Sequence, residues 1–157
     1  MTDIDQPDNL AATVQDWTAN ANAYAARKAE VLPENRAAIF DTLERHGIQT
    51  VTMSFDGYGD SGQIDDVSVA AGKPHDLAAI DIDQKQARWG EDAIETITVT
   101  LRTAIEDLGY AFLEEMHCGW ENNEGGSGEF VFDVAARTIT LDFHERYIST
   151  ETYYHEL

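Results

Sequence analysis

The sequence predicts an α+β fold in which an antiparallel sheet of about four strands, formed by two β-hairpins, is packed by helices on one face. Two stretches, 48–69 and 128–144, alternate apolar and polar residues as half-buried hairpins do; the first turns through a Gly-rich loop, and a Gly-rich loop leads into the second. Segments with apolar residues at helical spacing precede each of these stretches, and the chain shows no repeated β-α-β order of elements. The predicted order is α-α-β-β-α-β-β, and the 157 residues are the size of one domain, spanning 1–157.

The N-terminal part predicts two helices within residues 9–46. Residues 1–8 are polar, and we expect them to be frayed. Apolar residues at helical spacing mark a first helix over 9–29, namely Leu10, Val14, Trp17 and Tyr24. Leu32 and Pro33 are expected to end it, because proline suits the first position of a new helix. The second helix would then run to His46, before Gly47.

Residues 48–69 predict the first hairpin. Val51, Met53 and Phe55 alternate with small polar residues, and the segment 56–62 is expected to be the connecting loop. In the returning arm the alternation shifts across Asp65 and Asp66, which predicts a β-bulge there.

Residues 70–99 show no firm periodicity and are interpreted as a long connector with a short helical or extended piece, becoming β-like at 96–100. Thr100 is a suitable cap for a helix over 100–117. Gly109 lies inside this helix at a cost of ~1 kcal/mol.

In the second hairpin, 128–144, one oily face is formed by alternate residues of both arms. With Ala136 and Arg137 at the tip, Phe130 pairs with Phe143, and Glu129 faces His144 on the wet side. A register shifted by two residues keeps the same apolar face. Residues 148–157 form a short tail.

Acidic residues dominate the charge. The chain holds 30 Asp and Glu against 10 Lys and Arg, a net charge of -20. Residues 91–157 contribute 15 of the acids and only 3 of the bases. Such a protein repels nucleic-acid phosphate and anionic membrane as direct partners, and it attracts a basic protein surface at long range. The alternative is that acidity serves solubility alone.

The N-terminus lacks a signal peptide pattern, and no apolar run is long enough to span a membrane, so we expect a cytoplasmic protein. The single Cys118 cannot form an internal disulfide.

Two acidic Gly-rich loops, 56–62 and 120–129, share the same order of residue kinds. If the hairpins lie side by side, four carboxylates of these loops converge at one end of the sheet, namely Asp56, Asp60, Glu121 and Glu124. Carboxylate oxygens are the ligands that Ca²⁺ and Mg²⁺ prefer, although the order of an EF-hand loop is missing. Alternatively, the glycines supply turn geometry and the acids are solvated.

No residue set forms a catalytic motif. Cys118 follows His117 directly, so their side chains point apart on a helix rather than forming a thiolate and imidazole pair. The five histidines have no zinc-ligand spacing. We therefore predict no catalytic residues, and the protein is interpreted as non-enzymatic.

The segments SFDGYGDSGQID and GWENNEGGSGEFVFDVAARTITLDF resemble an uncharacterised family of bacterial and mobile-element proteins, a domain of unknown function. The resemblance covers residues 48–69 and 100–157. It implies a cytosolic bacterial origin and a plasmid or phage context, where small acidic proteins act on defence machinery. It implies no activity, cofactor or catalytic residue.

The leading functional hypothesis is a non-enzymatic interaction protein, a nucleic-acid mimic or inhibitor whose acidic C-terminal face binds a basic, nucleic-acid-handling protein. The residues expected to bind this partner are Glu114, Glu115, Trp120, Glu121, Glu124, Glu129, Asp133 and Asp142. Two alternatives remain open at this point. One is a divalent-cation or ligand-binding module built on the paired loops, and the other is a structural partner in a homo-oligomer or a toxin-antitoxin pair.

Overall fold

The computed structural model describes residues 7–71 and 75–157, with side chains from residue 14 onward, and confirms the α+β class. Most of the segment predicted to be frayed, residues 1–8, lies outside the described residues. The elements follow in this order along the chain: α1 (Pro7–Arg45), β1 (Ile48–Tyr58), β2 (Ser61–Ala71), the short 3-10 helix η1 (Leu77–Ala79), β3 (Asp81–Ala87), β4 (Ile94–Thr100), α2 (Leu101–Met116), β5 (Gly126–Asp133) and β6 (Thr138–Glu145).

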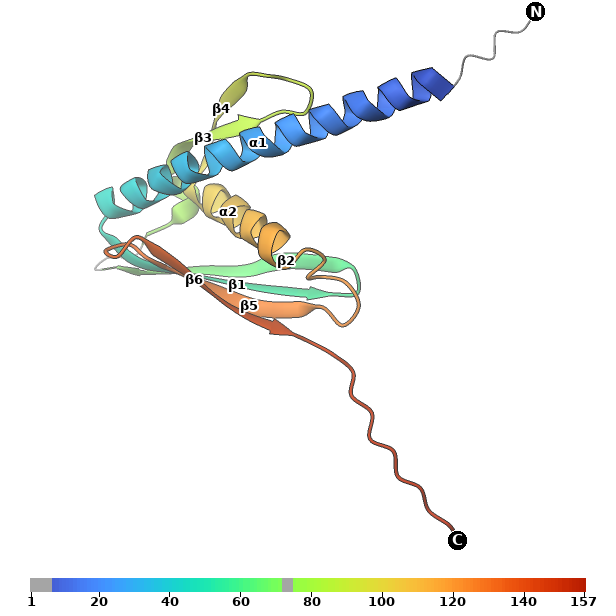
Figure 1. The fold of residues 1–157 in the computed structure, drawn as a ribbon. Helices are drawn as coiled ribbons and strands as arrows, with labels where there is room; N and C mark the ends of the chain where they lie inside the picture. The colour runs from blue at the N-terminus through green and yellow to red at the C-terminus, as the bar shows by residue number, and fades with distance from the viewer. Residues whose placement is uncertain (1–6, 72–74) are drawn as a thin grey trace, which may run out of the picture.

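The main sheet has four antiparallel strands in the order β2-β1-β5-β6, as predicted from the two hairpins. Helix α2 and the C-terminal half of α1 lie over one face of this sheet, and the N-terminal half of α1 projects past it (Figure 1). The core lies between the sheet and the two helices, where Met53, Phe132 and Ile105 are fully buried. No described helix covers the other face of the sheet (Figure 1).

The prediction of two N-terminal helices was wrong, because α1 is one helix of 39 residues with Pro33 inside it. A proline in a helix interior removes one backbone hydrogen bond and costs about 3 kcal/mol. Here Val31 before the proline and Ile39 and Phe40 after it are all buried, at 5%, 1% and 1% exposure. Burial of apolar side chains on both sides of Pro33 therefore keeps the helix continuous.

The first hairpin is confirmed, but its loop is shorter than predicted. The strands extend through most of the segment 56–62, and only Gly59 and Asp60 form the turn. Both have positive φ, 59° and 66°, which is the geometry of a type I′ turn. Ser54 pairs with Asp66 while Phe55 pairs with Ile64, so the predicted bulge is present at Asp65.

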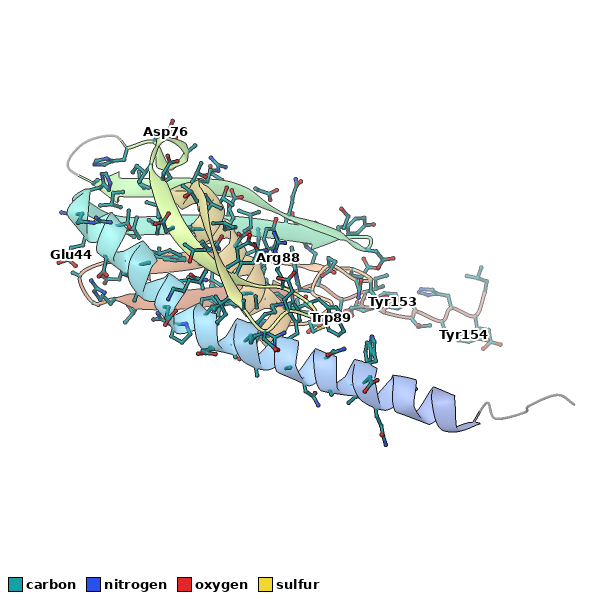
Figure 2. The ribbon with its side chains drawn as sticks, turned by 90° about the horizontal axis from the view of Figure 1, so that it is seen from above. Glu44, Asp76, Arg88, Trp89, Tyr153 and Tyr154 are labelled. Atoms are coloured by element: carbon teal, nitrogen blue, oxygen red, sulfur yellow. The ribbon has the colours of Figure 1, made fainter. Side chains whose placement is uncertain are left out.

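The predicted connector, 70–99, is wrong over most of its length, because it contains a second antiparallel sheet of two strands, β3 and β4. Asn35 of α1 holds β3 in place. Its side-chain amide donates to the Lys85 carbonyl at 2.8 Å and its side-chain oxygen accepts from the Lys85 N–H at 2.9 Å. The tip of this hairpin places Trp89 beside α1, where it contacts Tyr24 and Trp17 at ring-centroid distances of 5.5 and 6.0 Å (Figure 2).

Helix α2 begins as predicted, with Thr100 Oγ1 accepting a hydrogen bond from the Thr103 N–H at 3.1 Å. Packing against the sheet explains why a glycine occupies position 109 despite its cost to helix stability. A Cβ at this position would lie 2.3 Å from the Cε atom of Met53, so the glycine lets α2 approach the sheet closely.

The second hairpin has the register shifted by two residues from the one with Ala136 and Arg137 at its tip. Phe130 pairs with Leu141, and Glu129 faces Asp142 rather than His144. The loop consists of residues 134–137, because Val134 is buried and its N–H donates to the Gln49 carbonyl at 3.0 Å. This anchoring of Val134 to the first hairpin explains why the loop is longer than two residues.

Candidate interaction surface

The two acidic loops meet at one end of the sheet, the arrangement considered from the sequence for hairpins that lie side by side. Because β1 and β5 are antiparallel, the start of β5 lies next to the end of β1, with Gly57 opposite Gly126. The Asp60 N–H donates to the Glu121 carbonyl at 3.0 Å, and the Gly59 N–H donates to the Asn123 carbonyl at 3.4 Å. The loops therefore contact each other through their backbones.

Trp120 packs this junction from inside. Its side chain is only 9% exposed. The ring is therefore not available for the partner contact that was expected from the sequence. A Cβ at Gly57 or Gly62 would lie 2.6 or 2.4 Å from the indole ring, and Phe55 meets the ring edge-on at 5.3 Å. The indole of Trp120 thus occupies space that is free because Gly57 and Gly62 have no side chains.

Arg146 closes the junction from the other side of the sheet. Its Nη1 atom lies 2.8 Å from Asp56 Oδ1 and 3.1 Å from the Gly57 carbonyl oxygen. Its backbone N–H donates to the Gly125 carbonyl at 3.0 Å. The chain after β6 is thereby joined to the first hairpin across the start of β5.

The four carboxylates predicted to bind a cation are divided by this arrangement. Asp56 forms an ion pair with Arg146. Asp60 and Glu121 line one open hollow of about 390 Å³ with Tyr110, whereas Glu124 lines another of about 380 Å³ with Phe143. Among the side chains that the structure describes, residues 14–71 and 75–157, no three His, Cys, Asp or Glu are grouped as metal ligands would be.

His117 and Cys118 do not form a catalytic pair in this structure. The His117 ring stacks on Phe143 at a centroid distance of 3.8 Å and an interplanar angle of 4°. The Cys118 Sγ atom lies 3.6 Å from a Glu114 carboxylate oxygen. That neighbouring negative charge raises the pKa of the Cys118 thiol, which favours the protonated, weakly nucleophilic form.

The uncovered side of the main sheet, which we call the open face, carries carboxylates on all four of its strands. Along each strand the residues of the open face alternate with buried residues. Residues that are register partners on neighbouring strands lie on the same face. Its residues are Thr50, Thr52, Ser54 and Asp56 of β1, Gln63, Asp66, Ser68 and Ala70 of β2, Ser127, Glu129, Val131 and Asp133 of β5, and Thr138, Thr140, Asp142 and His144 of β6.

None of the four strands contains a Lys or Arg residue. The open face therefore presents mostly hydroxyl and carboxylate groups, together with Gln63, Ala70, Val131 and His144, and Arg146 at its end is paired to Asp56.

One row of residues crosses all four strands of the open face. It runs from Asp66 through Ser54 and Glu129 to Asp142, each residue being the register partner of the next. Glu129 and Asp142 are both exposed and face each other directly across neighbouring strands. Like charges at directly opposed positions destabilise a sheet, so this pair is a cost to the isolated fold.

The residues predicted to bind a partner fall into three places. Glu129, Asp133 and Asp142 lie on the open face, where Asp133 also accepts a hydrogen bond from the Ala136 N–H at 3.2 Å. Glu114 and Glu115 are exposed on the last turn of α2, which covers the opposite face of the sheet. Glu121 and Glu124 belong to the loop before β5.

Sequence reasoning missed Asp66 and the Ser and Thr residues as parts of this surface. Alternation along β1 already placed Thr50, Thr52 and Ser54 on the wet side. The position of Asp66 depends on the bulge at Asp65, which reverses the facing of residues in β2. A strand-by-strand count of Lys and Arg was the signal that could have found the open face.

No helix in the described part of the chain combines the length and apolarity needed to cross a membrane. Comparison with curated proteins and with solved structures finds no significant match. A family model matches residues 31–157, which is wider than the segments that carried the resemblance and includes β3 and β4. The match starts at Val31, a buried residue of α1, and leaves out the projecting part of the helix. The chain belongs to this family, a family of unknown function (DUF6878).

Proposed function

We propose that the protein is a non-enzymatic interaction protein that binds a basic surface of a nucleic-acid-handling protein through the open face. The observation that carries the proposal is the row Asp66, Ser54, Glu129 and Asp142 on a sheet whose strands contain no Lys or Arg. A basic partner would relieve the repulsion between Glu129 and Asp142 on binding.

The mimic hypothesis rests on acceptors presented by neighbouring strands of the open face, which lie ~4.8 Å apart and carry carboxylates on all four strands. The hydroxyl groups between the carboxylates, such as those of Ser54 and Thr140, add hydrogen-bonding groups without positive charge. A surface shaped to bind phosphates would meet a similar array of acceptors here.

The context implied by the family resemblance supports an inhibitor that acts on bacterial defence proteins. Net charge supports the same kind of partner, since -20 steers association with basic surfaces over distances of about a Debye length, ~8 Å at physiological salt.

The experiment is capture of binding proteins from a bacterial lysate, followed by competition. We expect one nucleic-acid-binding protein to be retained at low salt and released by duplex DNA or by about 1 M salt, because both remove the electrostatic attraction. Retention that resists DNA and high salt would contradict mimicry. Failure to retain any nucleic-acid-binding protein from a lysate of the native host would contradict the proposal as a whole.

A further inference from the structure

β6 is an open sheet edge with little of the usual protection against pairing. Native edges are protected by bulges, prolines, charged side chains (lysine above all) or covering elements, and of these β6 has only the acidic Asp142 and Glu145. The other edge strand, β2, contains the bulge at Asp65. β6 pairs with β5 without a register shift over residues 138–145, and it contains neither proline nor lysine.

Backbone hydrogen bonding shows which groups of β6 face this edge. The Arg146 N–H is directed to the Gly125 carbonyl of the neighbouring chain segment. Because backbone groups alternate in direction along a strand, the N–H and C=O groups of Ile139, Leu141, Phe143 and Glu145 are directed away from β5. They form a row of donors and acceptors along the open edge.

Apolar side chains accompany this row. Ile139, Leu141 and Phe143 are only partly buried against the core because they lie at its rim. Immediately after β6, Tyr147 and Ile148 are 83% and 74% exposed. The chain continues from there as an extended tail that leaves the sheet and carries Tyr153 and Tyr154 (Figures 1 and 2).

The edge is complementary to itself under a two-fold rotation. An antiparallel pair centred on Phe143 places Asp142 opposite the partner's His144, and His144 opposite the partner's Asp142. The same axis places Ile139 opposite the partner's Tyr147, and it brings two outward-facing backbone rows into register. Hydrogen-bond direction, the two Asp142–His144 pairs and the two Ile139–Tyr147 pairs therefore agree on this axis, which also places Leu141 opposite the partner's Glu145.

We propose that a second copy of this chain pairs antiparallel along β6, around a two-fold axis at Phe143. The two four-stranded sheets become one continuous sheet of eight strands, and residues 138–148 of each copy form the ladder between them. The ladder of this dimer uses backbone groups at the edge of the sheet, and Asp142 and His144 are the open-face residues that it shares with the proposed surface for the basic partner.

The test is sedimentation equilibrium of the full chain, without any partner, from about 1 µM to about 1 mM. We expect a mass that rises with concentration from 17.4 kDa toward twice that value. Because both copies are acidic, salt strengthens this association by screening, whereas salt weakens binding of a basic partner. A monomer throughout the range, at low and high salt, would overturn the proposal and leave the proposed function untouched.

Two sets of variants locate the interface. Glu145→Pro removes an outward N–H that has no partner among the described residues, and Glu145→Ala removes the same charge while keeping that N–H. We expect the proline variant to dissociate at least tenfold more readily than the alanine variant, with the circular dichroism spectrum of both unchanged. Equal association of the two variants would place the interface elsewhere.

His144→Asp tests the axis without changing the backbone. It places two like charges opposite each other in the dimer, and we expect several-fold weaker association. The double variant Asp142→His with His144→Asp exchanges the two residues and should restore association. A dimer insensitive to these changes but lost in Trp17→Ala would assign the contact to the projecting part of α1 and overturn the proposal.

Discussion

Glu129 of β5 faces Asp142 of β6 directly across the sheet, on a face that no described helix covers. The nearest opposite charge on the same strands is His144, whose Nε2 atom lies 3.4 Å from Asp142 Oδ2. That contact carries an ion pair only when the imidazole is protonated, and Glu129 has no cationic partner among the described residues. The pair is thus a local cost of folding that a basic partner would offset.

Glu129→Gln should stabilise the isolated protein. Removing one of two directly opposed carboxylates is worth roughly 0.2–1 kcal/mol in the free energy of unfolding, which urea denaturation measures. Glu91→Gln is the matched control, because Glu91 is an exposed residue in the turn between β3 and β4. An equal gain in both variants would show that only net charge matters, and a loss in Glu129→Gln would contradict the repulsion.

Trp120→Ala should destabilise the fold by about 3–5 kcal/mol, as loss of a large buried aromatic does. The indole packs directly against Gly57 and Gly62, so its removal would leave a cavity next to these two glycines. Trp17→Ala is the control, since Trp17 is 64% exposed. Thermal denaturation followed by circular dichroism distinguishes the two variants, and comparable small shifts in both would argue against a structural role for Trp120.

Asn35→Ala should loosen the second sheet. The variant loses both hydrogen bonds to the Lys85 backbone, each worth about 1 kcal/mol. We expect faster amide hydrogen exchange in β3 and β4 than in the wild type, with exchange in the main sheet nearly unchanged. Uniform acceleration in all strands would instead show that β3 and β4 unfold together with the core.

Asp107 predicts a pH effect of defined sign. Partial burial beside α1 and β3 raises the pKa of this carboxyl, although Gln84 donates to it at 3.3 Å and opposes the shift. A raised pKa in the folded state means that the ionised form destabilises the fold, and this penalty is relieved as pH falls through the folded pKa. Asp107→Asn should therefore raise the melting temperature at pH 7. The difference from the wild type should shrink at pH 4, and a gain that is constant with pH would contradict this explanation.

Local patterns were sufficient to predict the two hairpins, the bulge at Asp65 and the Thr100 cap, because alternation and capping depend on neighbouring residues. The continuity of α1 was not predictable in this way. The local rule for Pro33 predicts a helix boundary, and burial of Val31 and Ile39 against distant parts of the chain overrides it.

β3 was missed because its sequence, DIDQKQA, is nearly all polar. Its contacts with Asn35 of α1 come from a residue 50 positions away. The sequence raised the meeting of the two acidic loops only for hairpins that lie side by side, and it did not predict the separation of their carboxylates. For Asp56 the cause is Arg146, which follows the last strand and binds this carboxylate.

The most direct test of the central claim is the salt dependence of binding to the captured basic partner in two charge-matched variants. One removes three carboxylates from the open face, by Asp66→Asn, Glu129→Gln and Asp142→Asn. The other removes three exposed carboxylates from α1 and the β3–β4 turn, by Asp16→Asn, Glu30→Gln and Glu91→Gln.

The account predicts that the open-face variant raises Kd at least about tenfold and flattens the dependence of log Kd on log salt, while the other variant stays within about twofold of the wild type. Equal effects of the two variants, or a larger effect of the second, would contradict the assignment of the open face as the binding surface.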